Sequence, residues 1–355
     1  MASIIKTAFG TFQVQWTADK KRKSKTFKTK REAREFAVLI EQAPKERASS
    51  ITFGALLAEY RDNETIKKRG SRSESIRLNR LMKFPIAKKT LGELTSKDFQ
   101  QMIDERLASP SPTGGTISPA TVLREFTTLS TVLNYAIKSE LIEKNPLKEV
   151  ELPKPPEHRE RIASEAEQES IILASGWDGK SPPVSTTQLV ALAFIFSCRT
   201  GMRAGEILAI ENSWIDDRVI HLPKEITKTA SKRDVALSSD ALRLLNLAIE
   251  AKKDTSARIF GGVLNAHNRD ALFRKIRARA GLNPVYDSEG RLIREGLNFH
   301  DARATFATWA ASPDPKTGAP RLDVLALARQ TGHKDLKMLQ RYYRESAQNI
   351  AKRLD

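Results

Sequence analysis

The chain has 355 residues, 40% hydrophobic and 6% aromatic, a composition typical of a folded, helix-rich protein rather than a disordered one. Lysine and arginine number 60 against 43 aspartates and glutamates, so the formal net charge is +17 at pH 7. This surplus favours a polyanionic partner, most commonly nucleic acid, although a ribosome-bound or merely basic protein stays an alternative.

Several classes of protein are disfavoured by what the sequence lacks. Its one cysteine, Cys198, rules out an internal disulfide and lies in an apolar run, which predicts a buried structural thiol. No stretch approaches the roughly 18 apolar residues of a membrane span, and the first residues lack the apolar core of a signal peptide. No histidine pairs with cysteine at metal-ligand spacing, so we expect no structural zinc site. These features predict a cytoplasmic protein without a membrane partner.

Residues 1–48 predict a small basic module. Short strands are expected at 4–8, 12–16 and 23–27, followed by a helix whose capping box begins at Thr29. Through residue 47 there are 12 lysines and arginines against 5 acidic residues, a net charge of +7. The candidate DNA contacts are the cations around the third strand and the helix start: Lys20, Lys21, Arg22, Lys23, Lys25, Lys28, Lys30 and Arg31. A solvated basic hairpin is the alternative.

Residues 49–148 predict an all-helical domain. Apolar residues recur at three-to-four spacing in four segments: 51–60, 74–82, 96–107 and 120–138. Residues 149–163 contain three prolines in a charged stretch, which predicts an extended linker. A capping box at Ser164 then opens a third domain that runs to residue 355.

The third domain contains residues suited to phosphate chemistry. Arg203 lies in Thr-Gly-Met-Arg-Ala-Gly-Glu, with Glu206 one helical turn further on. Arginine binds phosphate bidentately and keeps its charge at any physiological pH. Alternation around residues 219–222 and 235–237 predicts a hairpin with Lys228 near its tip, where a lysine can protonate a leaving oxygen. Lys224 and Lys232 are near enough to be alternatives.

The last candidates lie towards the C-terminus. His300 and Arg303 are spaced by one helical turn, and His333 follows Gly332. Tyr342 comes nine positions after His333, and Tyr343 is its immediate rival as a nucleophile. Residues 312–321 look like an inserted loop, which we expect to project away from the site.

Together these residues resemble the tyrosine recombinase, or phage integrase, family. The resemblance implies a mainly α fold with small β-sheets (α+β): an arm-type three-stranded module, a helical core-binding domain, and a catalytic domain with a C-terminal tail. It implies that Glu206 holds Arg203, that Lys228 is the general acid, and that Tyr342 is the nucleophile. Arg203, Arg303 and His333 would stabilise the phosphorane, while His300 accepts the tyrosine proton or holds the phosphate. The family commonly has His-x-Leu-Arg-His, from which Ala302 and Ala304 depart without removing a reacting group.

The implied function is site-specific recombination through a 3′-phosphotyrosine, with no metal and no cofactor. Integration and excision of a mobile element are favoured by the basic N-terminal module. The implied partners are double-stranded recombination sites on the nucleoid of a prokaryote or phage, three further copies in a homo-tetramer, and accessory DNA-bending proteins. We expect the tail at 347–354 to dock on a neighbouring copy. A shufflon-type DNA invertase, a type IB topoisomerase and a catalytically silent DNA-binding protein remain alternatives.

Overall fold

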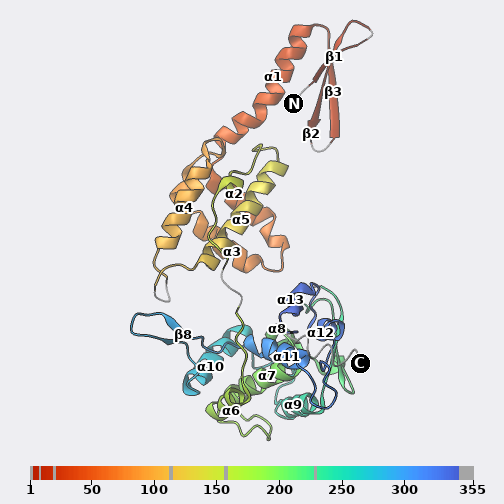
Figure 1. Cartoon of the computed structure of the whole chain (residues 1–355). Helices are drawn as coiled ribbons and strands as arrows, with labels where there is room; N and C mark the ends of the chain where they lie inside the picture. Colours follow the sequence, from red (N-terminus) through yellow and green to blue (C-terminus); the bar gives the residue numbers. More distant parts are fainter. Residues whose placement is uncertain are drawn as a thin grey trace. The chain divides into compact units, whose positions relative to one another are not determined.

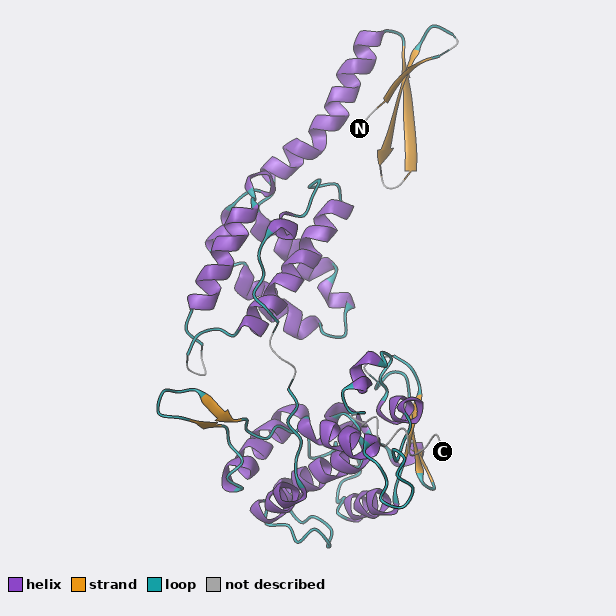
Figure 2. Cartoon of the chain, in the orientation of Figure 1, coloured by secondary structure: helices purple, strands orange, loops and turns teal. Residues whose placement is uncertain are grey.

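The computed structural model describes residues 3–7, 9–18, 21–111, 115–155, 159–227 and 230–343. By its internal contacts the chain divides into two compact units, Met1–His158 and Arg159–Asp355. Figure 1 labels the elements, and Figure 2 shows that helices make up most of both units beside small sheets. The predicted fold class, mainly α with small β-sheets, is confirmed. The finer division at residues 48, 148 and 163 stays a prediction.

The N-terminal sheet is antiparallel, in the order β1 (Ser3–Lys6), β2 (Phe12–Ala18), β3 (Lys21–Phe27). Helix α1 (Lys30–Ser50) follows the predicted capping box, since the Glu32 amide donates to Thr29 Oγ1 and the Thr29 amide to Glu32 Oε2, both at 3.2 Å. Alternation along β2 turns Phe12, Val14 and Trp16 towards α1, where they form a cluster with the buried Ala33. The module therefore has its own small core.

The helical part of the first unit is a bundle with an aromatic centre. Its helices are α2 (Phe53–Asn63), α3 (Ser71–Leu81), α4 (Ser96–Ala108) and α5 (Pro119–Lys138). Short 3₁₀ turns connect or follow them: η1 (Thr65–Lys67), η2 (Pro85–Lys88), η3 (Leu91–Glu93) and η4 (Pro146–Glu149). Phe53, Phe99 and Phe126 meet edge to face in the core. The apolar periodicity of the sequence therefore located all four helices.

The second unit is built around α7 (Thr186–Thr200), whose residues 190–198 are all buried. The other helices of this unit are α6 (Glu165–Ala174), α8 (Ala204–Ala209), α9 (Ser239–Glu250), α10 (Ala266–Arg279), α11 (Asp301–Ala311), α12 (Val324–Thr331) and α13 (Lys337–Gln340). Helices α9, α10 and α11 pack on α7. Because α7 is apolar on every side, it forms the centre of the domain rather than a surface helix.

Two small sheets complete the second unit. After η5 (Asn212–Trp214), β4 (Ile215–Asp216), β5 (Val219–Leu222) and β6 (Arg233–Ala236) pair antiparallel in that order, and β6 contacts α12. A separate hairpin joins β7 (Val285–Tyr286) to β8 (Leu292–Arg294). The predicted β5–β6 pairing is thereby confirmed, with Ile220 opposite Val235. Within the described residues, no helix combines the length and apolarity needed to cross a bilayer.

Candidate active site

The turn after α7 positions Arg203. Gly201 adopts a left-handed conformation (φ +67°), and a side chain there would come within 2.5 Å of the Phe306 ring. Only glycine fits both requirements, so the chain reverses tightly and places Arg203 at the N-cap of α8. Arg203 Nη1 donates to Glu206 Oε1 at 2.9 Å, and the Arg203 amide donates to Glu206 Oε2 at 2.8 Å. Glu206, 2% exposed, therefore fixes both the backbone and the side chain of Arg203.

Helix α11 contributes the second arginine. Arg303 is 5% exposed, and its Nη1 donates to the Gly201 carbonyl at 2.6 Å, which ties α11 to the turn that carries Arg203. His300 immediately precedes α11, where its carbonyl accepts the Arg303 amide at 3.1 Å, and it is exposed. The predicted spacing of one helical turn is thus present, with Arg303 buried and His300 at the surface.

His333 follows the C-terminal end of α12. Gly332 ends the helix in a left-handed conformation (φ +72°), and its carbonyl accepts from Arg203 Nη2 at 3.3 Å. The His333 ring lies beside Arg303, whose Nη2 is 3.3 Å and 3.4 Å from its two nitrogens, and Nδ1 is 2.7 Å from Thr331 Oγ1. The structure therefore brings Arg203, Arg303 and His333 together from three helices far apart in the sequence.

The assembled site carries an excess of buried positive charge. Arg203, Arg233 and Arg303 lie in one cluster, in which Glu206 is the carboxylate that pairs with two of them. Burial and the neighbouring charge of Arg203 together lower the pKa of Arg303 to about 9, so this arginine remains charged at neutral pH. Burial and the charge of Arg303 lower the pKa of His333 to about 3, so its imidazole is neutral. Such a cluster of cationic side chains stabilises a bound anion.

Two adjacent tyrosines follow α13, and they differ in what they contact. The Tyr343 hydroxyl donates to the Leu322 carbonyl at 2.8 Å, and burial raises the pKa of this phenol to about 12. Tyr342 is half-buried and lies under the Arg341 guanidinium, 5.4 Å from its ring centre. The negative charge that Tyr342 acquires on ionisation would favour the charged form of Arg303, so the two side chains are electrostatically linked. The Tyr343 hydroxyl is held by a backbone carbonyl, whereas Tyr342 packs beside Arg341 and lines the cavity described next.

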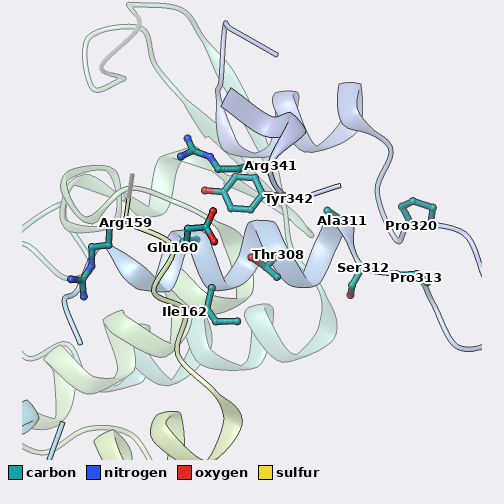
Figure 3. Close-up of a pocket in the computed structure, with 11 residues that line it drawn as sticks. Arg159, Glu160, Ile162, Thr308, Ala311, Ser312, Pro313, Pro320, Arg341 and Tyr342 are labelled. Atoms are coloured by element: carbon teal, nitrogen blue, oxygen red, sulfur yellow. The ribbon is translucent and has the colours of Figure 1, made fainter. Parts of the chain in front are cut away.

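A cavity of about 390 Å³ adjoins Tyr342. The cavity is lined by the segment with which this unit begins (residues 159–163, here called the strap), by one face of α11, and by the two ends of the loop after α11, as Figure 3 shows. Ser312, Pro313 and Pro320, at the two ends of the loop, lie on this wall, and the prediction that residues 312–321 project away from the site stays a prediction. Pro313 pairs with Pro320 in an isolated β-bridge, which folds both ends back together beside α11.

Some predicted site residues lie outside the described part of the chain. Lys228 is one of them, although the strands on either side of it are described, and Lys224 and Lys232 are exposed. The tail at 347–354 and Lys20 also lie outside the described residues. Within the described residues, no group of three or more side chains is placed to hold a metal ion.

The predicted DNA contacts in the N-terminal module divide between the two faces of its sheet. Lys25 pairs in register with the buried Val14, and its ammonium lies 4.7 Å from the Phe36 ring centre, on the side packed by α1. Arg22 pairs with Thr17 and belongs to the opposite face. Lys23, Lys28, Lys30 and Arg31 are exposed, and the backbone of Lys21 begins β3. Lys25 is exposed like the other described cations, and its ammonium in addition contacts an aromatic ring of the module.

Arg233 is the one member of the cluster that sequence analysis missed. It opens β6, is 9% exposed, and its Nη2 donates to Glu206 Oε2 at 2.6 Å. The signal was present in the strand alternation, because Val235 and Leu237 face inward and Arg233 lies two residues before Val235. An arginine at an inward position of a strand is unusual enough to indicate a function.

A buried arginine cluster beside a tyrosine, on a helical domain with a small antiparallel sheet, is the architecture of the DNA-cleaving tyrosine recombinases. The phage integrase family model matches residues 179–349, and the chain belongs to this family. It is 33% identical to an inferred integrase/recombinase of Haemophilus influenzae, over 97% of this chain and 87% of that protein. It is 29% identical to the shufflon-specific DNA recombinase of Escherichia coli, over 88% of this chain and 74% of that one.

Solved structures agree with this fold. A lambda integrase dimer bound to a COC′ core site aligns with a TM-score of 0.64 and 19% identity, over 97% of this chain and 96% of that one. The Tn1549 transposon integrase, in complex with circular intermediate DNA, aligns with a TM-score of 0.63 and 17% identity, over 86% and 100%. The fold class, the enzyme class and the family predicted from the sequence are therefore confirmed, and the chain is a site-specific DNA recombinase.

Proposed function

We propose that this recombinase cuts and rejoins double-stranded DNA through a 3′-phosphotyrosine and thereby integrates and excises a mobile element. The observation that carries the proposal is the charge imbalance around Glu206: Arg203 and Arg233 share this single carboxylate, and Arg303 lies beside them. A cluster of guanidinium groups with too few carboxylates attracts a further anion, and a phosphodiester fits the planar fork of arginine.

We propose the following roles for the individual residues. The Tyr342 oxygen attacks the scissile phosphorus while its proton passes to His300, and the bond to the 5′ oxygen breaks. Lys228 protonates that oxygen as it leaves, so the products are a 3′-phosphotyrosine and a free 5′ hydroxyl. Arg203, Arg303 and His333 stabilise the added negative charge of the pentavalent phosphorane, and Glu206 holds Arg203. The phosphotyrosine ester conserves the free energy of the broken phosphodiester bond. A 5′ hydroxyl from another strand can therefore attack this ester, release Tyr342 and rejoin the DNA.

Binding of the recombination sites is assigned to both units. The exposed cations of the N-terminal module supply the charge for arm-type contacts, and the helical bundle would bind the core site. Lambda integrase has been solved as a tetramer on a Holliday junction, and its alignment covers 97% of this chain with a TM-score of 0.62. We propose the same tetrameric assembly here on the nucleoid, with the tail at 347–354 linking neighbouring copies and accessory proteins bending the DNA.

Inversion of a DNA segment is the second candidate. It is favoured by the 29% identity to the shufflon-specific recombinase and uses the same chemistry at paired sites. Integration and inversion differ only in whether the two sites lie on separate molecules or in inverted orientation on one. A type IB topoisomerase activity would instead relax supercoiled plasmid without a specific site.

The test has two stages. A core site is first selected by the protein from a pool of random-sequence duplexes, and then placed on plasmids as a pair on two molecules, or as an inverted pair on one. Integration predicts joined plasmids, and inversion predicts a reversed segment. Relaxation of a plasmid that lacks the site, without exchange on either substrate, would contradict the recombinase proposal.

A further inference from the structure

The Arg233 side chain is buried, and the Glu206 carboxylate, which is shared with Arg203, balances its positive charge only in part. Its Nη2 donates to Glu206 Oε2 at 2.6 Å and its Nη1 to the Gln330 carbonyl at 2.8 Å. Its Nε–H is buried and has no acceptor among the described residues. An unsatisfied buried donor on a charged group is destabilising. A side chain retained under these conditions is better explained by a role in the site than by stability.

Glu206 connects Arg233 to Arg203. Its Oε1 accepts from Arg203 Nη1, and its Oε2 accepts from both the Arg203 amide and Arg233 Nη2. The carboxylate is thus held from two sides, and rotating it towards either arginine breaks a charge-assisted bond to the other. Without Arg233, the Glu206 carboxylate is held by Arg203 alone and can shift together with it, so the position of the Arg203 guanidinium is no longer fixed.

Arg233 also packs against the turn that carries His333. A side-chain carbon on Gly332 would lie 2.9 Å from Arg233 Cδ and 3.1 Å from Nε, so the two residues are in close contact. The neighbouring Gln330 reinforces this junction, because its side-chain amide exchanges hydrogen bonds with the Ala236 backbone of the same strand, both at 3.0 Å. Arg233 therefore bridges α8, the end of α12 and the start of β6.

We propose that Arg233 is a positioning residue for DNA cleavage, which fixes Arg203 through Glu206 and sets the Gly332–His333 turn against the scissile phosphate. The inference rests on the proposed function, and names a residue beyond those predicted to act on the phosphate. A lysine cannot take its place fully, because a single ammonium does not span Glu206 and the Gln330 carbonyl with the geometry of a planar fork.

The experiment compares the full-length wild type with Arg233→Met and Arg233→Lys. Single-turnover cleavage is measured on a nicked duplex carrying the selected core site, with either the natural scissile phosphate or an uncharged methylphosphonate. Binding of the same duplex and the melting temperature are measured in parallel. Arg233→Met should slow cleavage of the phosphate at least 100-fold and of the methylphosphonate less than 10-fold, with binding within 3-fold. Arg233→Lys should be intermediate.

The methylphosphonate arm separates positioning from folding. A residue that positions Arg203 for the phosphate charge is needed less when that charge is absent, whereas a general loss of structure slows both reactions equally. Equal slowing on both substrates, or wild-type cleavage by Arg233→Met, overturns the inference. If Arg233→Met does not fold, the slowing on the phosphate relative to that on the methylphosphonate is measured with Arg233→Lys instead. Failure of the wild type to cleave either duplex would instead count against the proposed function.

Discussion

Arg159 and Asp301 form a two-pronged ion pair between the strap that enters the second unit and the first residue of α11. Arg159 Nε donates to Asp301 Oδ1 at 2.9 Å and Nη2 to Oδ2 at 2.7 Å, with the Asp301 side chain 6% exposed. Four residues on, the Ala163 amide donates to Thr305 Oγ1 at 2.8 Å. The end of the predicted linker is thus bonded along the helix that carries Arg303.

Asp301→Asn should weaken this attachment. The asparagine removes the charge that Arg159 pairs with in a buried position, at a cost of about 2 kcal/mol in the free energy of unfolding. For a unit of this size that lowers the melting temperature by roughly 4–8 °C. The matched control is Asp216→Asn on the exposed end of β4, which should melt with the wild type. If Asp301→Asn and Asp216→Asn have the same melting temperature, the ion pair contributes nothing to the stability of the fold.

Gly332→Ala should impair the active site by more than the backbone strain that it introduces. The left-handed conformation costs an alanine about 1 kcal/mol. The added methyl group also collides with Arg233, whose guanidinium is held by hydrogen bonds to Glu206 and the Gln330 carbonyl. Gly318→Ala is the control, because Gly318 has nearly the same φ (+68°) and no atom within 4 Å of an added carbon. Both variants should lose similar stability from strain, but only Gly332→Ala should lose cleavage by 10-fold or more. Unimpaired cleavage by Gly332→Ala would contradict the packing described here.

His333 should respond to an anion in the pocket. Burial and Arg303 lower its pKa to about 3 from an ordinary 6.5, so in the free protein it stays neutral through most of the acid range. Since the unfolded chain takes up this proton between pH 6.5 and about 3 and the folded chain does not, His333 lowers stability as pH falls through that window. Orthovanadate, a mimic of the phosphorane, should raise the pKa of His333, as followed by the NMR shift of its ring proton. An unchanged titration with vanadate bound elsewhere would place the anion site away from His333.

Tyr343→Phe should be a stability variant and not a cleavage variant. The phenol loses its hydrogen bond to the Leu322 carbonyl, which stabilises the fold by about 1 kcal/mol. Chemical denaturation should detect that loss, while single-turnover cleavage stays within 3-fold of the wild type. A Tyr343→Phe enzyme with normal stability and no cleavage would reverse the assignment of the two tyrosines.

Local sequence signals predicted most of the fold. The capping boxes at Thr29 and Ser164 both form, and apolar spacing located the bundle helices to within a few residues at their ends. These features depend on neighbours in the chain, so the sequence contains them directly. The path of the loop at 312–321 was not predicted, because its bridge from Pro313 to Pro320 and its place beside α11 depend on tertiary contacts.

The candidate site was predictable in its residue types and less so in its connections. Arg203, Arg303 and His333 were predicted from motifs that resemble those of the tyrosine recombinase family, and the structure brings them within one cluster. Arg233 was missed because an arginine in a strand is normally a surface residue, and its buried partners Glu206 and Gln330 lie 27 and 97 positions away. The contact of Lys25 with an aromatic ring was likewise hidden, since it depends on a ring from α1.

The central claim is that Tyr342 is the nucleophile in a cationic phosphate pocket. The most direct measurement is covalent trapping on a nicked duplex with the selected core site, without divalent metal, resolved on denaturing gels. Wild type and Tyr343→Phe should form a protein–DNA adduct through the 3′ phosphate, and Tyr342→Phe should form none while still binding the duplex. An adduct that persists in Tyr342→Phe, or no adduct from a wild type that binds the site, would contradict the account.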